Sequence, residues 1–121
     1  MTNLTEFAQL FKSPPAAYRP MPQWSWNGDL TEARITEQLE QFVAQGSGGL
    51  FTHARPGLIT PYMSERWLEL WGFALQEAAR LGMTFHIYDE FMCPAGHAGG
   101  RVIAAYPHLA LQELTLEAWM G

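Results

Sequence analysis

Three apolar segments of the chain each end in polar side chains that can carry out acid–base or hydrogen-bonding chemistry. These side chains belong to Asn27, to His53 and Arg55, and to Asp89 and Glu90. Carboxylates can donate or accept protons, and arginine and histidine can hydrogen-bond the hydroxyls of a ligand. Amphipathic helical patterns separate the segments, which predicts a strand–helix–strand–helix–strand order. The carboxyl ends of parallel strands meet at one sheet edge, where ligand sites occur in α/β folds.

Asp89 and Glu90 form the strongest chemical feature. Strand alternation should direct them to opposite sides, so we expect only one to face the site. They are candidate catalytic acid–base groups and candidate sugar ligands. The alternative is a structural role, in which a carboxylate caps a loop amide or pairs with Arg55 or Arg101. Glycoside hydrolysis needs a second carboxylate across the sugar, so we favour site lining over direct catalysis.

His53 and Arg55 follow the second apolar segment and are predicted to line a substrate site. The guanidinium of arginine offers a fixed fork of donors that suits sugar hydroxyls or the carboxylate of a uronic acid. The alternative for Arg55 is an ion pair with Asp89 or Glu90.

Trp24 and Trp26 lie two residues apart on the first segment, so they share one face of a strand. They form either a sugar-stacking platform or two layers of packing inside a barrel. We favour packing for Trp24 and retain Trp26, nearer the strand end, as a substrate-binding candidate. Asn27, followed by Gly28, either binds hydroxyls or shapes a turn.

The other reactive side chains give weaker signals. His97 lies in a glycine-rich loop and is a substrate-binding candidate, although a structural role is the more frequent one for such a residue. His86, inside an apolar segment, is expected to be a core histidine. Cys93 has no adjacent base, so no nucleophile is predicted. The histidines lack the spacing of a metal site, and none is proposed.

The pattern of apolar and turn residues places these side chains on a regular series of elements. Asp29 to Glu32 has the spacing of a capping box, and Ser64 is the predicted N-cap of the later helix. The expected elements are a helix over 1–12, a proline-rich extended segment over 12–20, strands over about 22–27, from 48 and over 83–88, helices from 29 to 46 and from 64 to 82, a short helix over 101–106, and a strand or a helix over 109–119.

The fold class predicted from this order is α/β, with parallel strands forming the first three βα units of a (β/α)₈ TIM barrel. The strand starts lie about 27 and about 34 residues apart, close to the roughly 31 residues of a barrel unit. No Gly-x-Gly-x-x-Gly string opens the first helix, which argues against a dinucleotide fold. The predicted organisation is a lead-in over 1–20, three βα units over 21–107, and the start of a strand or an inserted β region over 108–121.

Three strands cannot close a barrel, so we expect the chain to be the N-terminal portion of a longer protein. Alone, it would need the remaining strands or would self-associate, because an open sheet leaves an edge and an apolar face uncovered.

Composition excludes several classes of protein. The 121 residues are 48% hydrophobic and carry a formal charge of −5, with no basic stripe that would indicate nucleic-acid binding. No apolar run reaches the roughly 18–20 residues of a membrane span. The N-terminus lacks the features of a secretion signal, and the single cysteine is typical of a reducing compartment, so a cytoplasmic location is expected.

Several strings of the chain resemble glycoside hydrolase family 106, the α-L-rhamnosidase-like group, and its uncharacterised relatives. The resemblance covers roughly residues 11–119. The strings are Pro20-Met-Pro-Gln-Trp-Ser-Trp-Asn-Gly28, His53-Ala-Arg-Pro-Gly-Leu58, Thr60-Pro-Tyr62 with Ser64 and Trp67, Tyr88-Asp-Glu90, and Pro94 with Ala98-Gly-Gly-Arg-Val102. The group more often has an aromatic residue where this chain has Cys93.

The resemblance implies a large enzyme with an N-terminal (β/α)₈ domain that hydrolyses a terminal sugar with inversion. It also implies calcium, which characterised members use, and an acid–base pair on strands beyond residue 121. We therefore predict the N-terminal portion of a glycoside hydrolase whose partner is a carbohydrate. The alternatives are a non-catalytic carbohydrate-binding fragment, an inert truncated product, and a barrel lyase or isomerase that uses the same strand ends.

Overall fold

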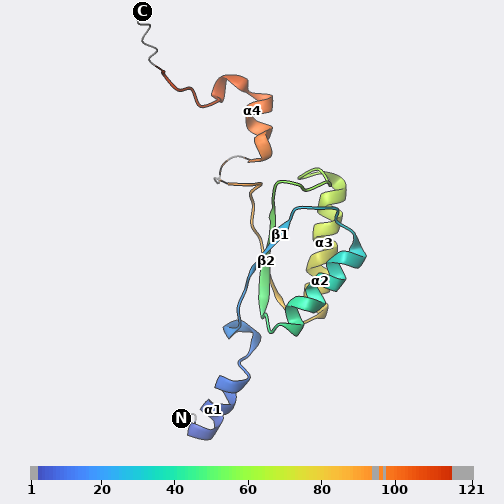
Figure 1. Cartoon of the computed structure of the whole chain (residues 1–121), viewed down its shortest axis with the longest axis vertical. Helices are drawn as coiled ribbons and strands as arrows, with labels where there is room; N and C mark the ends of the chain where they lie inside the picture. Colours follow the sequence, from blue (N-terminus) through green and yellow to red (C-terminus); the bar gives the residue numbers. More distant parts are fainter. Residues whose placement is uncertain (1–2, 94–95, 97, 116–121) are drawn as a thin grey trace, which may run out of the picture.

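A computed structural model shows an α/β unit in which a three-stranded parallel sheet is built in sequence order (Figure 1). The structure describes residues 3–93, 96 and 98–115. Its strands and helices are α1 (Leu4–Lys12), β1 (Gln23–Trp26), α2 (Glu32–Ala44), β2 (Gly49–Ala54), α3 (Glu65–Arg80), β3 (Thr84–His86) and α4 (Arg101–Ala105). Short 3₁₀ turns lie at Ala16–Tyr18, Ala98–Gly100 and Pro107–Leu109.

The sheet has the order β1-β2-β3, and both strand pairs are parallel. Ser25 lies opposite His53 in the first pair, and Phe51 lies opposite His86 in the second. The two crossover helices, α2 and α3, both cover the same face of the sheet (Figure 1). The predicted α/β class and parallel strand order are therefore confirmed.

The core lies between this face and the two helices. Ile35 and Leu39 are the buried residues of α2, as their helical spacing predicts. On α3 the buried set includes Leu70, whereas Leu68 and Leu75, which belong to the same apolar pattern, are 50% and 41% exposed. The apolar stripe of α3 is wider than one face of a helix, so pattern alone could not show which leucines turn inward.

Trp24 and Trp26 both point into this core, where they pack edge to face with ring centroids 5.5 Å apart. Trp24 also packs on Phe42 of α2, and Trp26 packs on Trp67 of α3. The shared face was predicted correctly. The packing role favoured for Trp24 is confirmed, but the ring packs under the helices and not on the opposite face of the sheet, and Trp26, which was retained as a substrate-binding candidate, is buried there too.

That opposite face is not covered by any element among the described residues. It carries Ser25, Phe51, His53 and His86, as the strand register requires. His86 is exposed, with Nε2 3.1 Å from the sulfur of Met21. The expectation of a core histidine was therefore wrong. The third strand is also shorter than predicted, since it ends at His86 and not at residue 88.

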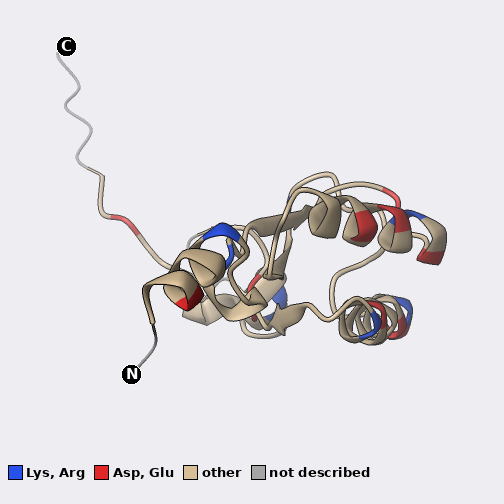
Figure 2. Cartoon of the chain, turned by 90° about the horizontal axis from the view of Figure 1, so that it is seen from below, with Lys and Arg blue, Asp and Glu red and all other residues tan. Residues whose placement is uncertain are grey.

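Ion pairs join the two helices on their solvent side, where Figure 2 shows the charged residues to gather. Arg66 of α3 binds Glu32 of α2 at 2.7 Å, and Arg80 of α3 binds Glu40 of α2 at 3.3 Å. These pairs are largely exposed, and pairs of this kind contribute about 0–1 kcal/mol each. Burial of the apolar core, rather than charge pairing, therefore holds the helices on the sheet.

The ends of the helices follow local signals, with one correction. Ser64 caps α3 by accepting the N–H of Trp67, as predicted. The N-cap of α2 is Thr31, whose hydroxyl accepts the N–H of Arg34, and not Asp29. Threonine next to the first helical residue is an equally good cap, so the Asp29–Glu32 spacing was misleading.

The proline-rich lead-in docks on the amino-terminal edge of the sheet. Gly48 lies so close to it that an added Cβ would be 1.9 Å from the carbonyl oxygen of Ala16. Arg19 fixes the turn by donating to the carbonyl of Pro14 at 2.7 Å. This contact determines where the chain enters β1.

Helices α1 and α4 project from opposite ends of the sheet–helix body (Figure 1). None of the residues of α1 is buried. Residues 111–115 form neither the strand nor the helix that was expected from 109, and 116–121 lie outside the described residues. Within the described residues, no helix is long and apolar enough to cross a membrane.

Candidate functional site

The carboxyl-terminal edge of the sheet brings together residues that follow β2 and β3. Beyond β3, the chain rejoins β2 through a bridge between Ala54 and Phe91, and the N–H of Met92 donates to the carbonyl of Ala54 at 3.0 Å. Because of this bridge, residues 91–93 cross the end of β2 directly beside His53 and Arg55. We call the residues His53, Arg55 and 88–93 the rim.

His53 is 2% exposed and holds the loop in place. Its Nε2 lies 3.1 Å from the carbonyl oxygen of Met92. A carbonyl only accepts, so Nε2 carries the hydrogen. The ring lies against Tyr88, with centroids 4.2 Å apart. Nδ1 is buried and has no hydrogen-bond partner in the described part of the chain. His53 thus lies at the predicted edge of the sheet, but its ring is buried against Tyr88 and Met92 and is not accessible to a ligand.

Arg55 is half-buried and lies at the rim with its backbone fixed on both sides. Its N–H donates to the carbonyl of Trp26 at 2.9 Å, and its own carbonyl accepts the N–H of Leu58 at 3.1 Å. The guanidinium Nη1 lies 3.5 Å from the sulfur of Cys93. The expected alternative, an ion pair with Asp89 or Glu90, is absent among the described residues.

Asp89 and Glu90 occupy different surroundings, although both lie beyond the end of β3. Glu90 is 8% exposed, and its two carboxylate oxygens lie 3.1 and 3.3 Å from the backbone N–H of Ala98. Asp89 is exposed and keeps its carboxylate open to solvent. Glu90 therefore caps a backbone amide eight residues later, which is one of the structural roles that the sequence left open, and Asp89 is the accessible carboxylate.

Tyr62 links the loop after β2 to this carboxylate pair, and sequence reasoning did not single it out. Its hydroxyl donates to the carbonyl of Asp89 at 3.1 Å. Burial raises the pKa of the Tyr62 phenol above its ordinary value, and the negative charges of Glu90 and Asp89 raise it further. The phenol therefore stays protonated and remains a donor. The sequence signals for it were its place in the string Thr60-Pro-Tyr62, which carries the family resemblance, and an aromatic residue just before a helix cap.

Three non-glycine residues with left-handed backbone lie in the loops at this edge. They are Met63, Met92 and Ala98, with φ of 60°, 67° and 50°. Met92 presents its carbonyl to His53 and its N–H to Ala54, while Ala98 presents its N–H to Glu90. Strain of this kind gathers at functional sites. No sequence signal predicts it, because these residue types avoid that conformation.

The remaining predicted site residues do not join the rim. Trp26 is 1% exposed beneath α3, so its ring cannot be a sugar platform at this edge. Asn27 is exposed at the end of β1 and lines a crevice of about 50 Å³ with Asp29 and Arg34. Its backbone stays near the loop after β2, since a Cβ on Gly57 would lie 2.8 Å from its carbonyl. His97 lies outside the described residues.

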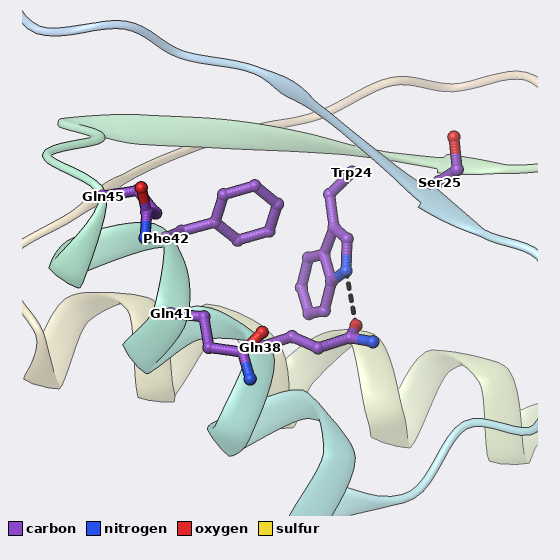
Figure 3. A pocket seen from close by; sticks show the side chains of 6 residues that line it. All are labelled: Trp24, Ser25, Gln38, Gln41, Phe42 and Gln45. Carbon is purple, nitrogen blue, oxygen red and sulfur yellow. Dashed lines mark hydrogen bonds between the residues drawn. The ribbon is translucent and has the colours of Figure 1, made fainter.

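Two larger grooves flank the sheet at its two open edges. One, of about 530 Å³, lies beside α3 and the residues after β3 and is mostly apolar, although Asp89 and Arg101 reach it. The other, of about 350 Å³, lies between β1 and α2. Figure 3 shows its glutamine side chains and the hydrogen bond from Trp24 Nε1 to Gln38, which measures 2.8 Å. Neither groove contains His53 or Arg55.

The calcium that the family resemblance implies finds no carboxylate cluster here. Among the described residues, no three histidine, cysteine, aspartate or glutamate side chains come together in a way that could hold a metal ion. Glu90 accepts the Ala98 amide, and Asp89 is exposed.

Comparison with known proteins gives one informative similarity. No protein-family model matches the chain. A protein of Formosa agariphila that carries the name "Putative beta-glucuronidase" is 36% identical to it over 90 residues, which is 69% of this chain. The chain spans about 8% of the length of that relative.

Proposed function

We propose that this chain supplies three βα units of a barrel glycoside hydrolase and, with them, part of the subsite that holds a terminal sugar. The observation that carries the proposal is the rim, the edge of the sheet where the residues after β2 and after β3 meet through the bridge between Ala54 and Phe91, with Arg55 as a donor fork and Asp89 as an exposed acceptor. The Formosa agariphila relative supports the same reaction class, because a β-glucuronidase hydrolyses a glycosidic bond.

The barrel assignment is supported by how the units are wound. The strands are parallel and in sequence order, and both crossover helices cover one face. A doubly wound sheet would place helices on both faces once the strand order reverses. In a closed barrel, the last unit would lie beside β1 and the fourth unit beside β3, where the two grooves are found. The uncovered face with Ser25, Phe51 and His86 would then become the barrel interior.

The chemistry proposed for the whole enzyme is protonation of the leaving-group oxygen with attack of water, through an oxocarbenium-like transition state. The rim would take part by binding. Asp89 accepts hydrogen bonds from sugar hydroxyls, and Arg55 donates to sugar oxygens. Glu90 keeps the loop in shape through the Ala98 amide, while the acid–base pair comes from strands outside this chain.

Within this proposal, we assign the chain to the rhamnosidase-like group, because several strings of its sequence resemble that group. The sugar is then either a terminal deoxyhexose, as in that group, or a uronic acid, as the name of the Formosa agariphila relative suggests. The side chains at the rim suit both, since hydroxyls and carboxylates each match a guanidinium.

The test uses the chain as it is. Amide resonances would be followed by NMR during titration with methyl α-L-rhamnoside and methyl β-D-glucuronide, and aryl glycosides of both sugars would be assayed for aglycone release. Shifts confined to residues 53–55 and 88–93 support the proposal, with or without turnover. Absence of shifts for both sugars contradicts it and favours an inert fragment. Turnover of free uronates or aldoses without glycoside binding would favour a lyase or an isomerase.

A further inference from the structure

We infer that Arg55 is a specificity-determining residue that recognises the carboxylate of a uronic acid, so that the sugar held at the rim is acidic and not a neutral hexose or deoxyhexose. This inference rests on the proposed function and names the substrate class of the same subsite. It concerns binding, and it leaves the acid–base chemistry with other residues.

The first support is the charge balance around Arg55. Among the described residues, Arg66 and Arg80 form the ion pairs, and Arg19 and Arg34 donate to backbone carbonyls. Arg101 also forms no ion pair within the described residues, but it is exposed on α4 in the groove beside α3, away from the end of β2. Arg55 instead has the sulfur of Cys93 at 3.5 Å, and a thiol is a weak acceptor. The thiol therefore satisfies little of the hydrogen-bonding capacity of the guanidinium. Its donors are thus left for an anionic ligand.

The second support is that the neighbouring carboxylates do not neutralise it. Glu90 is the buried acid of the rim, and both of its oxygens accept the N–H of Ala98. Asp89 is exposed, and its backbone carbonyl is tied to the hydroxyl of Tyr62. Among the described residues, Arg55 therefore forms no ion pair with Asp89 or Glu90, although all three belong to the rim.

The third support is preorganisation. The two backbone hydrogen bonds of Arg55, to Trp26 and from Leu58, fix its Cα at the end of β2. Pro56 follows directly, and its ring restricts the backbone of Arg55. A fork of donors held on a rigid strand end can form two parallel bonds with a carboxylate, and such charge-assisted bonds are about twice as strong as neutral ones.

These features predict discrimination between sugars that differ at one carbon. A hydroxymethyl group in place of the carboxylate would leave the guanidinium with a neutral acceptor. Hydrogen bonds to charged groups are stronger than those to neutral groups, so we expect the acidic sugar to bind about tenfold more tightly. The overall charge of −5 disfavours anions in general, so this preference needs a specific cation.

The experiment compares methyl β-D-glucuronide with methyl β-D-glucoside, which differ only in the group at C6. Dissociation constants would be measured by NMR titration for the wild type, for Arg55→Gln and for Arg55→Lys. Arg66→Gln, on the outer side of α3, is the matched control. We expect the wild type and the control to prefer the glucuronide about tenfold. Arg55→Gln should abolish the preference and keep the weak affinity for the glucoside, and Arg55→Lys should retain part of it.

The outcomes separate this inference from the proposed function. Equal affinities for the two sugars in the wild type, or an unchanged preference in Arg55→Gln, would show that Arg55 does not read the carboxylate, while the proposed sugar subsite would stand. Sodium acetate at the same concentration should not displace the glucuronide. If it does, the arginine binds any small anion and the inference is wrong. Failure of both sugars to bind would contradict the proposed function itself.

Discussion

The two tryptophans of β1 offer a matched pair that tests whether this face of the strand is core. Trp24 and Trp26 are 5% and 1% exposed, and each packs edge to face on one helix aromatic, with centroids 6.1 and 6.0 Å apart. They differ in the indole N–H. That of Trp24 donates to Gln38 at 2.8 Å, whereas that of Trp26 is buried with no acceptor among the described residues.

Trp24→Phe and Trp26→Phe should therefore destabilise the chain unequally. Both lose part of a ring, which costs about 1–2 kcal/mol in burial and packing. Trp24→Phe also loses a hydrogen bond, at about 1 kcal/mol. Trp26→Phe instead removes an unsatisfied buried donor, which returns about 1–3 kcal/mol. We expect Trp24→Phe to be the less stable variant, by about 2 kcal/mol or more in the free energy of unfolding.

The assay is urea unfolding followed by far-UV circular dichroism, because the substitutions change the fluorescence signal itself. With an m-value of about 2 kcal/mol per molar, the two midpoints should differ by about 1 M. Equal midpoints, or a lower midpoint for Trp26→Phe, would refute the reasoning that the Trp26 indole is unpaired in the core. Binding of sugars at the rim should be the same in both variants, since both rings lie beneath the helices.

Three further changes have expected outcomes. Gly48→Ala should displace the lead-in, because its Cβ would collide with the carbonyl of Ala16. We expect a large drop in the urea midpoint of unfolding, larger than that of Gly28→Ala, where the Cβ meets open space. Ser64→Ala should cost about 1 kcal/mol by removing the cap of α3, a loss that Ser64→Asp would largely avoid in the same urea assay. The pKa of Glu77 lies below its ordinary value of 4.5 because Arg80 donates to its carboxylate. The stability that the ionised Glu77 contributes is complete above pH 4.5 and is lost as the pH falls through its lower pKa in the folded state. The unfolding midpoint of Arg80→Met should therefore depend less on acid pH than that of the wild type.

The arrangement of strands could be predicted from the sequence because it rests on strong local signals. Apolar runs that end in polar residues, and helices that begin at a cap and end at Gly46 or Gly82, determine the order of elements. With that order, the parallel pairing places Arg55 and Glu90 at one edge. These are short-range properties of the chain, and the structure agrees with them.

The details of the site could not be predicted because they depend on contacts between distant segments. Whether Trp26 faces the helices or the opposite side follows from the register of the sheet, which alternation alone leaves open by one residue. The burial of His53 results from Met92, 39 residues later, in a backbone conformation that methionine seldom adopts. The role of Glu90 likewise depends on how a distant loop amide is placed.

The exposed state of His86 has a similar origin. An apolar strand suggests coverage on both faces, yet in this chain both helices cover the same face. The sequence of β3 therefore fits a barrel interior better than it fits the three-stranded sheet by itself, which is consistent with the proposal that further units complete the fold.

The claim that the sugar binds at the carboxyl-terminal edge of the sheet is tested most directly by paramagnetic relaxation. A spin-labelled methyl glucuronide would be added to the isotopically labelled chain, and the broadening of each amide resonance would be recorded. The account predicts strong broadening at residues 53–55 and 88–93, with none at residues 47–49 and 82–84 at the other end of the same strands. Broadening centred on residues 47–49 and 82–84, or spread evenly over both ends, would contradict it.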